Sequence, residues 1–366
     1  MSFVHTHGLQ CRPVQAGPGS TVSPVLVEVL RGDTLESSHR GSLAVLDADG
    51  AVLASLGDID RPIFPRSAVK LLQALPLVES GAAERLGLSD DELALACASH
   101  NGEEPHVAAA TALLAKAGLP VSALECGSHW PLFETASRAL AAAGREPTPL
   151  HNNCSGKHGG FLCLACALHG SIDLRQYVRG YVHADHPLMR EVTAALEAVT
   201  GFDSSTAPRG TDGCSIPTYG IELRRLALAF ARVGSGVGLR EGHVRAAQRL
   251  RRAIAHAPFM VAGTGRFDTR VMQQLGERVC CKVGAEGVFC ASLPSLGLGI
   301  ALKIDDGNNA RAAEVVMASL IEASLSPSGA DAEMLHALSR PALRNWNGIH
   351  VGQLRPAAAL TGLRLR

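Results

Sequence analysis

The order of strand-like and helix-like segments constrains the fold of this 366-residue chain most strongly. Apolar runs typical of strands occur near both ends of the chain, and the residues between them have helical spacing. The expected strands are residues 25–30, 42–47, 51–56, 279–283, 287–291 and 298–304. Strands at both ends around a helical middle predict an α/β fold of the α+β type, with a mainly antiparallel sheet built from both chain ends.

Apolar spacing of three and four residues predicts the helices of the middle region. They are expected at 65–79, 90–98, 105–117, 134–143, 159–170, 185–200, 310–323 and, on either side of a glycine-rich break, within 222–256. At roughly 150 residues per domain, this length predicts one large domain of two packed lobes over residues 25–340. A variable segment is expected at 1–24 and a C-terminal tail at 341–366.

Composition argues against several classes of function. The 34 basic residues balance the 34 acidic ones and aromatic residues make up 4%, which argues against a nucleic-acid partner. No apolar stretch approaches the ~20 residues that cross a bilayer, and the first residues do not resemble a signal peptide. We therefore expect a cytoplasmic protein without a membrane partner, whose ten cysteines are thiols or metal ligands.

Lysine is rare in this chain. Five of the 34 basic residues are lysines, namely Lys70, Lys116, Lys157, Lys282 and Lys303. Arginine stays protonated, whereas a buried lysine can act as a proton acceptor. The few lysines therefore either mark positions that need amine chemistry or reflect composition bias.

Three short motifs occur in the order used by serine β-lactamases and penicillin-binding proteins. Ser67 and Lys70 form an S-x-x-K pair, one turn apart on a predicted helix, from which the amine could reach the hydroxyl. Ser99-His100-Asn101 is an S-x-N, and Lys282-Val283-Gly284 is a K-x-G on a predicted strand. The alternative is a helix residue pair, a polar helix end and a surface lysine with no shared role.

A second group of residues has donors suited to a metal ion. Cys154, Lys157 and His158 lie within Asn152–Gly160, and Cys214 follows Asp212 closely. Thiolates and imidazole are good zinc ligands, and an amine can serve when it is deprotonated. Spacing alone also allows buried free cysteines, or a Cys154–His158 nucleophile and base.

Together these motifs resemble the asparaginase II family, the rhizobial or class 3 type of L-asparaginase. The resemblance runs from about Val25 to about Ala323 and is most specific in Asn152–His158. The other matching stretches are residues 31–41, 65–70, 98–103, 212–214 and 263–269. The resemblance implies a serine β-lactamase/glutaminase-like fold, a homodimer, and the side-chain amide of L-asparagine as substrate.

The resemblance also implies roles for individual residues. It implies two Ser–Lys pairs, Ser67–Lys70 and Ser99–Lys282, and a zinc ion bound by Cys154, Lys157 and Cys214. We expect Ser67 to attack and Lys70 to accept its proton, while Ser99 and Lys282 form a second relay. Arg66, Asp212 and His158 are the expected substrate-binding residues, and zinc is expected to orient the substrate.

Three other functions share some of these features. A β-lactamase or penicillin-binding-type serine hydrolase uses the same three motifs, but it would need export. A glutaminase would need a pocket for one more methylene group. A metal-binding or redox-sensing protein would use the cysteines and release no ammonia from any amide.

Overall fold

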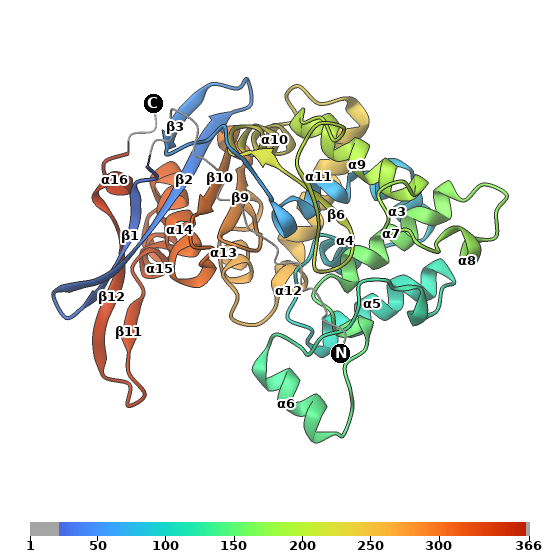
Figure 1. The fold of residues 1–366 in the computed structure, drawn as a ribbon, viewed down its shortest axis with the longest axis horizontal. Coiled ribbons are helices and arrows are strands. Elements are labelled where there is room, and N and C mark those ends of the chain that lie inside the picture. Colours follow the sequence, from blue (N-terminus) through green and yellow to red (C-terminus); the bar gives the residue numbers. More distant parts are fainter. Residues whose placement is uncertain (1–21, 364–366) are drawn as a thin grey trace, which may run out of the picture.

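The computed structural model describes residues 22–363, and its largest sheet has eight strands that pair only antiparallel. Seven strands follow the order β11-β12-β1-β2-β10-β9-β8, and β3 pairs with β2 beside this path. Their bounds are β1 Val25–Arg31, β2 Thr34–Asp47, β3 Val52–Leu56, β8 Cys280–Val283, β9 Val288–Leu293, β10 Leu298–Ile304, β11 Ala342–Arg344 and β12 His350–Pro356. The predicted α+β fold, with a sheet from both chain ends, is confirmed (Figure 1).

The long strand β2 joins the two halves of this sheet. Its residues up to Arg40 pair with β1, and its residues from Gly41 onward pair with β10. A Cβ atom on Gly41 would lie 2.3 Å from the carbonyl oxygen of Lys303, so only glycine fits where β2 passes from one partner to the other. We did not predict the first half of β2, because most of its side chains are polar and exposed.

The prediction of a separate C-terminal tail after residue 340 is wrong for residues 342–356. Strand β12 pairs with β1 over Val27–Arg31, and β11 pairs with β12 at the edge of the sheet. These strands complete the sheet because the backbone groups of β1 would otherwise face solvent. Of the expected segment 1–24, residues 1–21 lie outside the described residues.

Helices form most of the remaining structure, largely where the spacing predicted them. They include α4 Asp90–Ala96, α5 Glu104–Ala117, α6 Glu134–Ala142, α7 Ser155–Leu168, α9 Pro187–Thr200, α10 Leu223–Ser235, α11 Glu241–His256 and α14 Glu314–Leu325. Six helices lie outside the predicted ranges: α3 Ala82–Arg85, α8 Leu174–Tyr177, α12 Pro258–Ala262, α13 Phe267–Leu275, α15 Gly329–Ser339 and α16 Ala358–Thr361. The predicted helix 65–79 is broken into a 3₁₀ turn at Arg66–Val69, α1 Lys70–Gln73 and α2 Leu75–Glu79.

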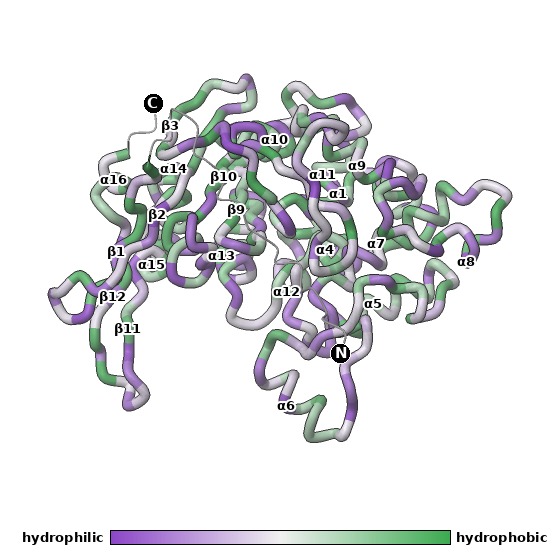
Figure 2. Tube along the Cα trace, viewed as in Figure 1, coloured by the Kyte–Doolittle hydropathy of each residue, from purple (hydrophilic) through white to green (hydrophobic). Residues whose placement is uncertain are grey.

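One continuous hydrophobic core runs through the sheet and the helical part (Figure 2). Helix α10 packs on β10, β9 and β2, while α14 packs against β1 and β12. In the helical part, α7 contacts α4 and α5, and it lies closest to α4 at Gly156, where a Cβ atom would meet the Leu95 carbonyl oxygen at 2.3 Å. The glycines of the Asn152–Gly160 stretch therefore have a packing role.

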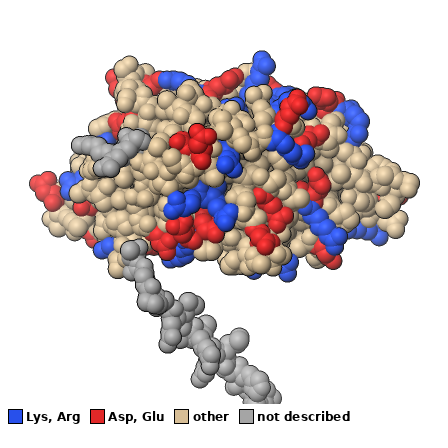
Figure 3. Space-filling view, turned by 90° about the horizontal axis from the view of Figure 1, so that it is seen from above, with Lys and Arg blue, Asp and Glu red and all other residues tan. Residues whose placement is uncertain are grey.

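The face in Figure 3 shows basic and acidic side chains interspersed, without a large patch of one sign. Within residues 22–363, no helix combines the length and the apolar character that crossing a membrane requires.

Candidate active site

Ser67 lies in a strained turn beside a small cavity. Its neighbour Arg66 has a positive φ of 51°, a conformation that is rare for residues other than glycine. Ser67, Lys70, Lys157 and Asp212 all line this cavity, whose volume is about 10 Å³. The turn thus brings the predicted nucleophile to the two lysines and the carboxylate that the sequence singled out.

Lys70 is buried, and its amine bonds Ser99 instead of Ser67. The Nζ atom lies 2.5 Å from the Ala98 carbonyl oxygen, 2.9 Å from Ser99 Oγ and 3.1 Å from Cys154 Sγ. All three partners can accept a hydrogen bond from the amine. The hydrogen bond that joins the two predicted relays is therefore Lys70–Ser99.

Neither of the predicted pairs, Ser67–Lys70 and Ser99–Lys282, is joined by a hydrogen bond within residues 22–363. Helical spacing placed Lys70 one turn from Ser67, but the helix is broken there and the long lysine side chain reaches the end of α4. Ser67 and Lys70 share the cavity wall without a hydrogen bond between them in the described structure.

Ser99 and Asn101 are fixed by the loop that follows α4. Their backbone N–H groups donate to the carbonyl oxygens of Val261 and Ala262, at 2.9 and 2.8 Å. The Asn101 side-chain amide donates to Glu103 and accepts from Arg266, each at just over 3 Å. The S-x-N motif is thus buried, and its hydrogen bonds hold it against the end of α12 and the residues that follow.

Lys282 is the buried lysine that is best suited to accept a proton near neutral pH. It lies on β8, its Nζ donates to the Val283 carbonyl oxygen at 2.7 Å, and its side chain is 3% exposed. Burial lowers the pKa of Lys282 to about 7, although the nearby Asp268 carboxylate opposes this shift. A neutral amine is therefore available at this position under mildly alkaline conditions.

The glycine of the K-x-G motif serves packing. A Cβ atom on Gly284 would lie 2.6 Å from the Pro65 carbonyl oxygen. Glycine therefore lets the end of β8 lie directly against the turn that carries Ser67. Asp268 supports the same strand end by accepting the Val283 N–H at 2.9 Å.

Two thiols and one amine converge beside the cavity. Cys154 is at the start of α7, and Cys214 is in the turn between β5 Arg209–Thr211 and β6 Pro217–Tyr219. Lys157 Nζ lies 2.9 Å from Cys214 Sγ, and Lys70 Nζ lies 3.1 Å from Cys154 Sγ. The neighbouring Cys214 thiol and the positive charges of Lys70 and Lys157 outweigh burial and hold the pKa of the Cys154 thiol well below its usual range.

This donor set fits a zinc ion with three protein ligands. Zinc binds thiolate sulfur and nitrogen, and sites with three protein donors leave one position for water or substrate. The described residues contain no cluster of three or more His, Cys, Asp or Glu side chains suited to a metal ion. A metal at this place therefore depends on the Lys157 amine as the third donor.

Arg66 and Asp212 form an ion pair on the cavity wall. Arg66 Nε lies 2.6 Å from one Asp212 carboxylate oxygen, and Nη2 lies 3.3 Å from the other. Burial alone would raise the pKa of Asp212, but the bonds from Arg66 and the charge of Lys157 lower it overall. The cavity thus presents a guanidinium and an ionised carboxylate side by side.

His158 is not among the residues that line this cavity. It is fully buried on α7, and its Nδ1 is bonded to the Tyr181 hydroxyl at 2.6 Å. Burial and the charges of Lys157 and Lys70 hold the pKa of His158 well below its usual range, so the ring is neutral. The structure places His158 behind the predicted metal ligands, which does not agree with direct contact to substrate.

The comparison with known families agrees with this arrangement. The family model described as L-asparaginase II matches residues 27–356, nearly the whole described chain. The chain belongs to the L-asparaginase II family. The match includes every predicted site residue and extends through β12. No protein in the curated collection matches the chain.

Membership in the L-asparaginase II family makes the chain an L-asparagine amidohydrolase. Two groups that support the site had no assigned role in the sequence analysis: Asp268 beside Lys282, and Glu103 beside Asn101. Glu103 and Asp268 lie in stretches that resemble the family, but such a resemblance does not indicate which residues of a stretch face the site.

Proposed function

We propose that the chain hydrolyses the side-chain amide of L-asparagine through an ester on Ser67. The Ser67 oxygen attacks the amide carbon, the C–N bond breaks, and the leaving nitrogen takes a proton to depart as ammonia. Water then attacks the ester, which releases L-aspartate and restores the serine. The observation that carries this proposal is the single cavity shared by Ser67, Lys70, Lys157 and Asp212 in an L-asparaginase II chain.

The proton relay combines both Ser–Lys pairs. Lys70 shares the cavity wall with Ser67 and holds Ser99 through its hydrogen bond of 2.9 Å. Lys70 can accept the Ser67 proton only as a neutral amine, because an ammonium has no free electron pair. Lys282, with a pKa of about 7, is the amine that is neutral at the start and takes up the proton that the relay passes on.

Arg66 and Asp212 recognise the head group of the amino acid. A guanidinium binds an α-carboxylate, and a carboxylate binds an α-ammonium. In the structure the two side chains form an ion pair with each other on the cavity wall. Substrate therefore exchanges one ion pair for two, which keeps the buried charges paired throughout binding.

Cys154, Lys157 and Cys214 would hold the zinc ion. A bound zinc ion supplies a fixed positive centre that can orient a polar substrate. The three side chains also shape the cavity, because Lys157 lines it and lies next to Cys214. We further propose a cytoplasmic homodimer, which size-exclusion chromatography and cell fractionation test directly.

Ser99 is the second candidate for the nucleophile. It is the hydroxyl that a lysine amine bonds in the structure, but it is 6% exposed and does not line the cavity. Ser67 faces the cavity together with the two groups that recognise the substrate. Cavity geometry therefore favours Ser67, and the hydrogen bond to Lys70 favours Ser99.

Ammonia release with three substrates tests the proposed function. L-Asparagine should be the best substrate and L-glutamine much poorer, because a well-fitted site penalises one methylene by ~1–3 kcal/mol. Nitrocefin should not be hydrolysed. Equal turnover of asparagine and glutamine at saturation would make the chain a general amidase, and nitrocefin hydrolysis without ammonia release would favour the β-lactamase alternative.

A further inference from the structure

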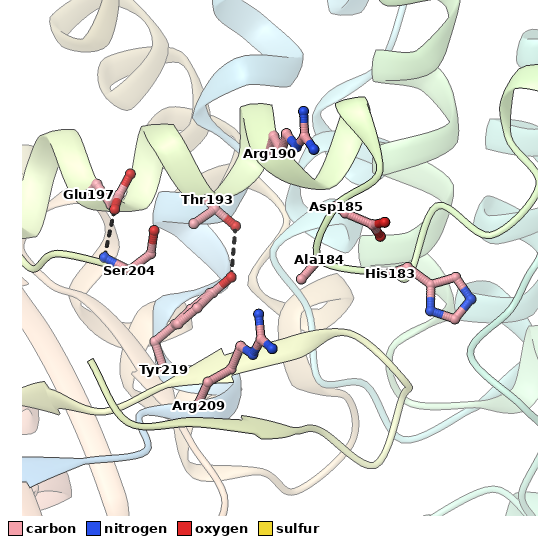
Figure 4. Close-up of a pocket in the computed structure, with 9 residues that line it drawn as sticks. All are labelled: His183, Ala184, Asp185, Arg190, Thr193, Glu197, Ser204, Arg209 and Tyr219. Atoms are coloured by element: carbon pink, nitrogen blue, oxygen red, sulfur yellow. Dashed lines mark hydrogen bonds between the residues drawn. The ribbon is translucent and has the colours of Figure 1, made fainter. Parts of the chain in front are cut away.

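A second, larger cavity lies beside the cavity at Ser67. Its volume is about 580 Å³, within the range of pockets that bind small molecules. Helix α9 and the β5–β6 hairpin form its walls, as Figure 4 shows. Tyr219 lines both cavities and is the one residue that the two linings share.

The larger cavity presents charges of both signs. Figure 4 shows Arg190 on α9 and Arg209 on the hairpin on opposite sides of it, with Asp185 at one end and Glu197 at the other. Arg190, Arg209 and Asp185 are exposed, and none of the hydrogen bonds drawn in Figure 4 involves them. Glu197 accepts the Ser204 N–H at 2.7 Å through one carboxylate oxygen.

These charges fit a zwitterion. Arg190 and Arg209 can bind a carboxylate through charge-assisted hydrogen bonds, and Asp185 and Glu197 can accept from an ammonium. A polyanion such as a nucleotide would bring its phosphates close to the two carboxylates. The cavity therefore favours a ligand that carries both charges, such as a free α-amino acid.

The hairpin connects this cavity to the site. Arg209 faces Tyr219 across the β5–β6 pairing, and the same hairpin carries Asp212 and Cys214 in its turn. Tyr219 is 6% exposed, and its hydroxyl lies 3.5 Å from the Thr193 hydroxyl of α9. A ligand that holds Arg209 therefore contacts the same hairpin that shapes the cavity at Ser67.

The cavity at Ser67 must widen before substrate can enter. Its volume of about 10 Å³ has room for about one water molecule. Movement of Tyr219 away from Thr193 would join it to the larger cavity, which is already wide enough for an amino acid.

We propose that the larger cavity is a loading site, where L-asparagine binds by its α-carboxylate and α-ammonium before it passes Tyr219. This inference rests on the proposed function for the identity of the amino acid. Arg190 and Arg209 hold the carboxylate, while one of the two acidic side chains, Asp185 or Glu197, holds the ammonium. The loading site then raises the chance that substrate is present when the hairpin opens.

Equilibrium dialysis with radiolabelled L-asparagine tests the loading site. A Ser67→Ala/Ser99→Ala variant, checked for lack of ammonia release, should bind two asparagines per chain at saturation. Adding Arg190→Ala and Arg209→Ala should leave one. Both arginines are exposed, so their removal should not alter the melting temperature.

Kinetics provide the second readout. In the active chain, Arg190→Ala/Arg209→Ala should lower kcat/KM about tenfold, the effect of losing one charge-assisted contact, with kcat unchanged. Arg252→Ala, an exposed arginine on α11 outside the cavity, is the matched control and should change neither value. One asparagine per chain with or without the two arginines, or an unchanged kcat/KM, would overturn the loading site. A wild-type chain that releases no ammonia would overturn the proposed function, and the dialysis result would still decide the loading site.

Discussion

At the residue scale, three of the five lysines surround one site. Lys70, Lys157 and Lys282 are almost fully buried and lie near Cys154, whereas Lys116 and Lys303 do not line the cavity. The gathering of three scarce lysines is what we expect if they mark positions that need amine chemistry, and that role stays a prediction. Arginine at these positions would remain charged and could not exchange a proton.

The partners of these lysines could not be predicted from spacing. Ser67 and Lys70 lie three residues apart, yet Lys70 bonds Ser99, which comes 29 residues later than Lys70. That contact depends on the position of the end of α4, which tertiary packing of α4, α7 and α12 determines. The sequence could identify the residues of the site, but not which hydroxyl each amine reaches.

The pKa of Lys282 predicts the pH dependence of the reaction. Burial lowers this pKa to about 7, so the amine is protonated below pH 7 and loses its capacity to accept a proton there. The value of kcat/KM should therefore rise with pH through about 7 and level off above it. A rate that is constant from about pH 6 to about pH 8 would exclude Lys282 as the proton acceptor.

Asp268→Asn is the matched variant for this prediction. The Asp268 carboxylate raises the pKa of Lys282, so a neutral amide should lower that pKa and move the rising limb to lower pH. The amide oxygen can still accept the Val283 N–H, which keeps the local backbone in place. A shift of the limb to higher pH would contradict this assignment.

At the element scale, the start of α7 and the β5–β6 hairpin bring Cys154 and Cys214 together, although these residues are 60 positions apart in the sequence. If these are metal ligands, purified chain should carry about one zinc ion, and Cys154→Ser or Cys214→Ser should lose it. Loss of zinc should raise KM more than it lowers kcat, because the proposed role of the ion is to orient substrate.

Cys163→Ser is the control for the zinc prediction. Cys163 is buried on α7, but its sulfur bonds the Leu113 carbonyl oxygen away from the cavity. This variant should keep its zinc and its KM. Full activity in a chain without metal would mean that Cys154, Lys157 and Cys214 are packed side chains only.

Sheet elements were predictable where they are apolar and less so where they are exposed. The buried strands β9 and β10 were predicted nearly to the residue, whereas the first half of β2 alternates little and faces solvent. Strand β12 pairs with β1 more than 300 residues away, at Val27 and Pro356. A local sequence pattern does not show which distant strand will pair with it, so the sequence predicts a tail where the structure has β11 and β12.

Removal of these strands should destabilise the whole chain. A chain that ends at residue 341 loses β11 and β12 and leaves the β1 edge open, so it should melt at lower temperature and aggregate. A chain that ends at residue 363 keeps all described strands and should melt like the full chain. Equal melting temperatures for the two truncations would mean that β12 contributes nothing measurable to the sheet.

At the scale of the whole molecule, the candidate active site lies between the sheet and the helical part. Lys282 comes from β8 of the sheet, Ser99 from the loop after α4, and Ser67 from the turn that connects the first strands to the helices. Gly284 lets β8 lie against that turn. Relative movement of the two parts would thus change the cavity directly, which is consistent with a site that has to open for substrate.

The identity of the acylated serine is the most direct test of the catalytic account. Wild-type chain should be mixed with L-asparagine, quenched in acid within one turnover, digested, and analysed by mass spectrometry. We predict an aspartyl ester on Ser67, the hydroxyl that lines the cavity with Asp212 and Lys70. An ester on Ser99 would contradict the assignment of Ser67 as the nucleophile. A Ser67→Ala variant that remains active and forms no ester on either serine would contradict it too.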